Sequence, residues 1–205
     1  MNESDASGKD PYVPIDEHSK VSLAVDLFAQ GIHRAPIANS EGGIIGSISQ
    51  SDIIKYLSSK LHEGELKHVG AKTVKELGLA EKKVVTTNIH DAILVAIENI
   101  VENAASCVGV VDSQGKLVGN LSASDFKGLY REEFPSFLLN IGDYLEKHSP
   151  ASLNPICCTE ATTLLQVIQE MRDNNIHHLY VIDDFKPVSI ISATDVLKSI
   201  RDFVL

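Results

Sequence analysis

The chain has 205 residues, of which 43% are hydrophobic and 22% are charged, as is typical of a globular protein with one or two domains. Its formal net charge of −10 argues against nucleic acid or an anionic membrane as the main partner, because both bind basic surfaces. No apolar run approaches the roughly 20 residues that a membrane-spanning helix needs. Residues 1–10 lack the apolar centre of a secretory signal, and we expect them to form a flexible tail.

The first set of predicted elements follows this tail. It comprises a short extended segment at residues 12–14, a helix at 22–30, a strand at 32–37, a Glu-Gly-Gly turn at 41–43, a strand at 44–48 and a helix at 51–57. The helix assignment rests on Val21, Val25 and Phe28, which share one helical face. Together these elements form a β-α-β-β-α unit.

The same order of elements occurs twice more. The second copy has an extended segment at 84–86, a helix at 91–101, strands at 107–111 and 117–121, and a helix beginning near Ser124. The third has an extended segment at 156–158, a helix at 163–171, strands at 178–182 and 188–191, and a helix at 194–203. Short helical segments are predicted between the copies, at 73–77 and 141–145.

Each copy also carries the pattern apolar-Ser-x-Ser/Thr-Asp-apolar, where the second strand turns into the closing helix. Asp52 and Asp125 are 73 residues apart, and Asp125 and Asp195 are 70 apart. A fixed period of this size indicates a repeat architecture. We therefore predict an α/β protein with repeats at 11–60, 84–131 and 155–205 and linkers at 61–83 and 132–154. One unit cannot bury both faces of its sheet, so each repeat should pack against another.

The Ser-x-x-Asp spacing has two explanations. A serine followed three residues later by an acid is close to a capping box, which satisfies the exposed N–H groups at a helix start. Alternatively, the carboxylate could accept hydrogen bonds from the vicinal hydroxyls of a ribose. The partial positive charge of the helix N-terminus would then favour a phosphate nearby. Recurrence does not decide between them, because a repeated fold also repeats its caps.

The unit resembles the CBS (cystathionine beta-synthase) repeat on the strength of these three motifs. Repeats of that family pair into a Bateman module whose clefts bind adenosine compounds, with the motif's aspartate on the ribose. The resemblance therefore implies tandem CBS repeats, with the second and third copies forming a pair. It also implies AMP, ADP or ATP as ligand, with no further cofactor.

The order of elements is more closely similar to the gamma regulatory subunits of AMP-activated protein kinase, over the second to fourth of their repeats. Residues 31–37, 72–77 and 175–183 carry this similarity. It implies a non-enzymatic energy sensor whose partners are protein kinase catalytic and scaffold subunits, in the cytoplasm or the nucleus. A Bateman module that regulates another partner, and a CBS scaffold that binds no nucleotide, remain as alternatives.

The resemblance assigns nucleotide-binding roles to positions in all three repeats. Asp52, Asp125 and Asp195 would hold ribose, beside Ser49, Ser122, Ser192, Ser124 and Thr194 at the helix starts. His33, Arg34, His177 and His178 would face phosphates, with Lys147 or His148 in place of a linker arginine. Ala105 and Ser106 would line an adenine pocket, and Tyr12 and Ile156 would contact the base.

Three departures from the family pattern affect this assignment. His178 stands where the gamma subunits have arginine, so a permanent positive charge is lost there. Cys107 occupies the equivalent place in the second repeat. The family's first repeat also has no counterpart, although His33 and Arg34 would complete a site with its aspartate. Either the chain is a fragment, or its first repeat pairs with a repeat of another molecule, as in a homodimer.

Metal and nucleophile chemistry find little support in the sequence. His177 and His178 are neighbours on a predicted strand and would point to opposite faces, and no Cys-x-x-Cys or His-x-x-x-His pattern occurs. The three cysteines, Cys107, Cys157 and Cys158, are a sparse, odd count that favours reduced packing residues in an intracellular protein. We therefore expect neither a metal site nor an enzyme.

Overall fold

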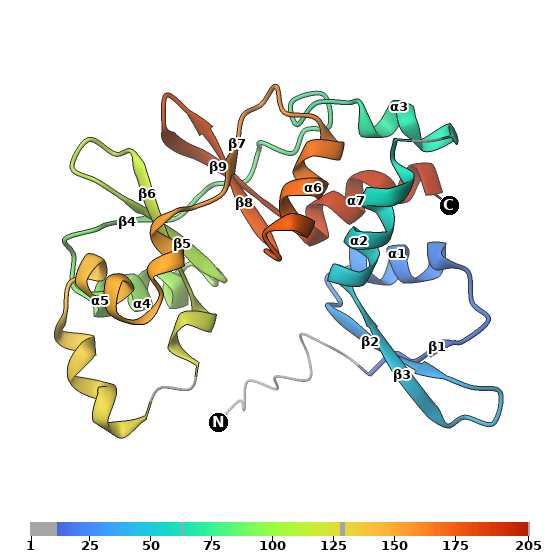
Figure 1. The fold of residues 1–205 in the computed structure, drawn as a ribbon, viewed down its shortest axis with the longest axis horizontal. Helices are drawn as coiled ribbons and strands as arrows, with labels where there is room; N and C mark the ends of the chain where they lie inside the picture. Colours follow the sequence, from blue (N-terminus) through green and yellow to red (C-terminus); the bar gives the residue numbers. More distant parts are fainter. Residues whose placement is uncertain (1–11, 63, 128–129, 205) are drawn as a thin grey trace. The chain divides into compact units, whose positions relative to one another are not determined.

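Three strand-and-helix units follow one another along the computed structural model (Figure 1), which describes residues 12–62, 64–127 and 130–204. The tail predicted at residues 1–10 lies outside the described residues. The first unit comprises β1 (Ile15–Asp16), α1 (Val21–Ala29), β2 (Arg34–Ala38), β3 (Ile44–Ser49) and α2 (Gln50–Lys60). The second comprises β4 (Thr86–Asn88), α4 (Ile93–Glu102), β5 (Cys107–Val111), β6 (Leu117–Ser122) and the 3₁₀ turn η3 (Ala123–Phe126). The third comprises β7 (Cys157–Cys158), α6 (Leu164–Asp173), β8 (His178–Asp183), β9 (Lys186–Ser192) and α7 (Ala193–Val204).

Each unit builds one three-stranded sheet in chain order. In all three sheets the opening strand runs parallel to the next, as Ile15↔Ile37, Thr86↔Gly109 and Cys157↔Tyr180 show. In the first two sheets the third strand returns antiparallel, which brings Arg34 opposite Ser49 and Cys107 opposite Ser122. The predicted β-α-β-β order is therefore confirmed in every copy.

The linkers contain η2 (Gly64–Leu66), α3 (Lys67–Gly70), η4 (Arg131–Leu138), α5 (Ile141–His148) and η5 (Pro150–Leu153). The helix expected at 141–145 is present as α5. The helix expected at 73–77 is wrong. Thr73 instead forms an antiparallel bridge with Thr163 and, with Glu76, caps a single turn that ends at Gly78 in the left-handed region.

The closing helix predicted near Ser124 is also wrong, because η3 is a four-residue 3₁₀ turn rather than an α-helix. The sequence places Gly128 and Pro135 after it, and both residues disfavour a continuing α-helix. The corresponding α2 and α7 continue for 11 and 12 residues. The three opening strands also begin one to three residues later than predicted, at Ile15, Thr86 and Cys157.

The chain divides into two compact units. Among the described residues, the first comprises those within 12–79, 161–178 and 191–204. Within it α1 packs against α7, and α2 packs against α6. Phe28, Leu57 and Ile168 are almost fully buried at these helices. The first repeat, expected to be unpaired within the chain or part of a truncated module, thus packs its helices against those of the third.

The second unit comprises residues 80–160 and 179–190. Its core joins the β5–β6 sheet to α4 and α5, and Ile93, Val110 and Tyr144 are fully buried in it. The strands of the third repeat contact this sheet. The Tyr180 hydroxyl donates to Asn120 Oδ1 at 2.6 Å, and a Cβ atom added at Gly109 would lie 3.3 Å from the Tyr180 ring, closer than most Cβ contacts. Glycine at 109 therefore lets the two strands approach.

Phe28 provides a test of the helix packing. It is 0% exposed on α1, whereas Val101 on α4 is 72% exposed. The two positions are equivalent, because each lies three residues before a residue in the left-handed region, Gly31 or Ala104. We expect Phe28→Ala to lower the free energy of unfolding by about 3–5 kcal/mol, because it leaves a cavity. Val101→Ala should change it by less than about 0.5 kcal/mol. Urea unfolding followed by circular dichroism measures both, and equal effects would contradict the packing described.

Candidate functional site

The three Ser-x-x-Asp motifs share one hydrogen-bond arrangement. In each, a strand ends at the serine, and the aspartate three residues on turns one carboxylate oxygen, Oδ2, back to it. Asp52 accepts from Ser49 N at 2.9 Å and from Ser49 Oγ at 2.6 Å. The corresponding distances are 2.7 and 2.7 Å for Asp125 with Ser122, and 2.9 and 2.5 Å for Asp195 with Ser192. The capping interpretation is thus confirmed in all three repeats.

The capping bonds of Asp52 involve only one of its two carboxylate oxygens. Both bonds to Ser49 go to Oδ2, and Asp52 is exposed on the surface. A carboxylate carries two oxygens with about four acceptor positions, so Oδ1 of Asp52 remains available to a ligand. The serine bonds fix the direction of that oxygen. Capping and ribose binding are therefore compatible in one side chain.

A second backbone bond ties each motif to the residue that precedes the middle strand of its sheet. The residue after the serine donates its N–H to a carbonyl: Gln50 to His33 at 3.0 Å, Ala123 to Ser106 at 3.1 Å and Ala193 to His177 at 2.8 Å. His33, Ser106 and His177 thus occupy equivalent positions beside the helix starts. The structure brings these predicted residues to the motifs of their own repeats.

The first repeat has a permanent cation at its motif. Arg34 faces Ser49 across the β2–β3 ladder, and both Arg34 and His33 are exposed. The hydrogen bond from the Ser49 hydroxyl lowers the pKa of Asp52 most, and burial opposes it. The backbone N–H of Ser49 and then the charges of Lys55 and Arg34 lower the pKa further, so that the net shift is downward. Asp52 is therefore held as a carboxylate.

The third repeat's motif lies beside the first repeat's helix α2. Thr194 Oγ1 accepts from Gln50 Nε2 at 2.9 Å, and Ser51 Oγ is 3.3 Å from His177 Nδ1. A shallow hollow opens next to this contact. Its lining includes Ser51, Lys55, Arg172, Asn175, His177 and Ala193. His177 is the one predicted phosphate ligand that borders this hollow.

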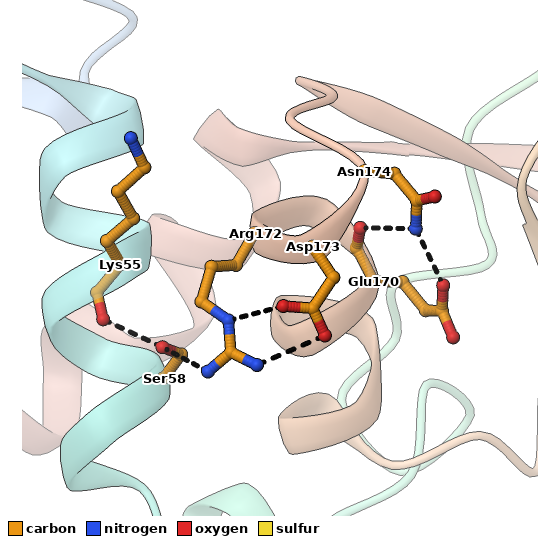
Figure 2. Close-up of polar contacts among 6 residues, drawn as sticks. All are labelled: Lys55, Ser58, Glu170, Arg172, Asp173 and Asn174. Carbon is orange, nitrogen blue, oxygen red and sulfur yellow. Dashed lines mark hydrogen bonds and ion pairs between the residues drawn. The ribbon is translucent and has the colours of Figure 1, made fainter.

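The charges around the hollow are partly neutralised (Figure 2). Arg172 pairs with Asp173 through two hydrogen bonds, at 2.7 and 3.1 Å, and donates to Ser58 Oγ at 3.1 Å. Ser58 in turn donates to the carbonyl of Lys55 at 2.7 Å. The ammonium group of Lys55 points away from Arg172. Arg172 therefore links α6 to α2, and its guanidinium group and the Lys55 ammonium group do not point toward a common position.

The second repeat's motif is surrounded by the linker that follows it. Ser124 Oγ lies 2.6 Å from Ser122 Oγ, and Ser152 Oγ donates to the second oxygen of Asp125 at a long 3.4 Å. Tyr144 donates its hydroxyl to the backbone carbonyl of Asp125 at 3.2 Å. Ala105 is half-buried next to Ser106, on the strand side of this motif.

His148 is largely buried. Its side chain is 10% exposed, its ring packs on Tyr144 at 4.7 Å between centroids, and its Nδ1 is 3.8 Å from Glu133. Lys147, the other candidate for the linker cation, donates to Ser136 Oγ at 2.9 Å. Both side chains fasten the linker helix α5 to η4.

The remaining predicted residues are more scattered. Tyr12 is 72% exposed and precedes β1 by three residues. Ile156 is partly buried, and its carbonyl accepts from Tyr180 N at 3.2 Å. Ile156 belongs to the second compact unit and Asp195 to the first. His178 is half-buried at the start of β8.

Sequence reasoning missed Gln50, Tyr144 and Ser152, which contact the motifs. Gln50 is 6% exposed and had a signal that could have been used: it is polar where the other copies carry Ala123 and Ala193. The other two lie in the linker after the second repeat, and no local pattern connects them to Asp125.

The structure also bears on metal and thiol chemistry. Among the described residues, no group of three or more His, Cys, Asp or Glu side chains could hold a metal ion. Burial raises the pKa of the Cys107 and Cys157 thiols and that of Cys158 to about 12, so these thiols stay protonated at neutral pH. None of the described helices has both the length and the apolar character to cross a membrane.

The lowered pKa of Asp52 predicts a pH-dependent contribution to stability. Its folded pKa lies below the unfolded value of about 3.9, so the stabilisation is complete above that value and is lost as pH falls through the folded pKa. Asp52→Asn should therefore lower the free energy of unfolding by up to about 1 kcal/mol at neutral pH, and by less in acid. Urea unfolding of the variant and the unmodified chain, at neutral pH and in acid, measures this difference in stability. Glu41→Gln, in an exposed turn, is the control, and a difference independent of pH would contradict the assignment.

Comparison with known proteins identifies the repeat. The CBS domain family matches residues 8–59, 74–132 and 142–202. Among curated proteins, the SNF1-related protein kinase regulatory subunit gamma-like PV42a of Arabidopsis thaliana is 24% identical over 221 residues, covering 91% of this chain and 62% of that protein. Protein sds23 of Neosartorya fischeri is 23% identical over 197 residues, covering 89% and 36%. The chain thus spans less than two thirds of the length of these relatives.

Solved structures show the same fold. A Methanocaldococcus jannaschii protein, described as a proposed archaeal homologue of g-AMPK, superposes with a TM-score of 0.68 at 23% identity, covering 92% of this chain and 66% of that one. An uncharacterised Pyrococcus horikoshii protein gives 0.70 at 19% identity, covering 92% and 78%. At these identities the likeness establishes the fold alone. The predicted fold class is confirmed: the chain belongs to the CBS domain family and carries three CBS repeats in tandem.

Proposed function

We propose that this chain is a regulatory module that binds AMP, ADP or ATP and reports the bound nucleotide to a protein kinase complex of the AMP-activated type. It performs no catalysis of its own. The observation that carries the proposal is the repeated motif geometry, in which each aspartate is anchored to a serine through one oxygen at a helix start. Because the serine orients the carboxylate before the ligand binds, no further entropy is lost in ordering this side chain on binding.

The chemistry around these motifs suits a ribose phosphate. A fixed carboxylate oxygen accepts hydrogen bonds from the ribose hydroxyls, as acids do in dinucleotide folds. The N-termini of α2 and α7 favour a phosphate nearby. Arg34, directly across from Ser49, adds a permanent positive charge to the first motif.

The kinase partner is supported by one relative. A protein named as a gamma-like kinase regulatory subunit is similar to this chain over 91% of its length. In that role, binding of nucleotide would shift the equilibrium between arrangements of the repeats, and catalytic and scaffold subunits would respond to the shift. Purification of the tagged chain from cells, followed by identification of bound proteins, tests this part separately from nucleotide binding.

A Bateman module that regulates a different partner is the second candidate. The SDS23 proteins, which are not named as kinase subunits, match the chain as well, one of them over 89% of its length. Co-purification with a protein other than a kinase would favour this candidate. The CBS scaffold without ligand is the third, and the intact capping bonds at all three motifs are what it requires.

Deoxynucleotides separate ribose binding from capping. We expect calorimetry to show AMP and ATP binding to the unmodified chain and binding of 2′-deoxy-AMP about tenfold or more weaker, since a hydrogen bond to a charged group is lost. The triple variant Asp52→Asn, Asp125→Asn, Asp195→Asn should lose both the affinity and the discrimination. Asp112→Asn is the control, because Asp112 only closes a turn by accepting from Gln114 N and Lys116 N.

The scaffold gives a different result in the same experiment. It predicts no heat with any adenosine compound, no change in unfolding temperature on adding nucleotide, and a loss of about 1 kcal/mol of stability for each Asp→Ala substitution. That outcome would overturn the proposed function.

A further inference from the structure

Gln50 is a buried polar residue inside the first motif. It is the first residue of α2, between Ser49 and Ser51, and only 6% of it is exposed. The equivalent positions of the other two repeats hold Ala123 and Ala193. A long amide in a position that elsewhere takes a methyl group must find buried hydrogen-bond partners.

Its amide has two such partners. Nε2 donates to the backbone carbonyl of Phe28, at the end of α1, at 3.1 Å, and to Thr194 Oγ1, in the third motif, at 2.9 Å. A backbone carbonyl can only accept, so the atom facing Phe28 must be the NH₂ group. The same group therefore also donates to Thr194, and the orientation of the amide is determined by chemistry.

This bond constrains the direction in which the Thr194 hydroxyl can donate its hydrogen. A hydroxyl has one hydrogen to donate and two lone pairs. Since Gln50 occupies a lone pair, the hydrogen of Thr194 must point elsewhere. The corresponding hydroxyls of the other motifs have different neighbours: Ser51 lies near His177 Nδ1 at 3.3 Å, and Ser124 near Ser122 Oγ at 2.6 Å. The first motif thus contacts two residues of the third repeat, Thr194 and His177.

We propose that Gln50 is a positioning residue that sets the Thr194 hydroxyl as a hydrogen-bond donor toward the phosphate of a nucleotide at the third motif. The affinity of the third repeat for the phosphate is then set partly by a residue of the first. The inference rests on the proposed function and deepens it. It also distinguishes the third motif from the second, whose hydroxyl pair lies within one repeat.

The test isolates the third motif. In a parent carrying Asp52→Asn and Asp125→Asn, only Asp195 keeps its charge. Into this parent we introduce Gln50→Met, which keeps the length of the side chain without its donor, and separately Thr194→Val. AMP and adenosine binding are measured by calorimetry, and the unfolding temperature is recorded for each variant.

We expect Gln50→Met to weaken AMP binding about fivefold to tenfold, the worth of one hydrogen bond, and to leave adenosine binding unchanged. Thr194→Val should cause a similar loss, and the double variant should be no worse than either single one, because both remove the same interaction. A purely structural role would weaken AMP and adenosine alike, or lower only the unfolding temperature.

Two results are decisive in the other direction. If Gln50→Met binds AMP as tightly as its parent, or loses AMP and adenosine binding equally, the inference is overturned while the proposed function stands. If the unmodified chain binds no adenosine compound, the proposed function fails, and the inference fails with it.

Discussion

The bond between each serine and the aspartate three residues later is the interaction on which the sites depend. It joins the end of a strand to the start of the next turn in all three repeats. Because the serine backbone and hydroxyl both donate to one oxygen, the carboxylate caps the turn and is oriented at once. The structural role and the proposed ligand-binding role therefore fall on one side chain, and a substitution there would affect both.

Helix packing within the first compact unit gives the motifs a second level of organisation. The first and third repeats exchange contacts between α1 and α7 and between α2 and α6, so that two helix starts lie close enough for Gln50 to reach Thr194. Residues 144 positions apart in sequence are thus joined by one hydrogen bond. The second motif has linker residues around it instead, among them Tyr144 and Ser152.

Much of this could be predicted from sequence because a repeat supplies its own comparison. Three aligned copies located the strands, the junctions and the aspartates, and the resemblance supplied the family. The predictions that failed concern two local segments. The segment at 73–77 looks apolar-periodic, but Gly78 ends it after one turn. The helix predicted near Ser124 is not continued. The environment of His148 and the reach of Gln50 depend on long-range packing, which periodicity does not encode.

The strand register makes the junctions electrostatically unequal. The residue facing the motif's serine is Arg34 in the first sheet and Cys107 in the second, and burial keeps that thiol protonated. Binding sites that share a geometry but differ in local charge prefer ligands of different charge and are filled over different ligand concentrations. Under the proposed function, the first and second junctions would therefore be filled over different concentration ranges of one nucleotide, rather than at a single threshold.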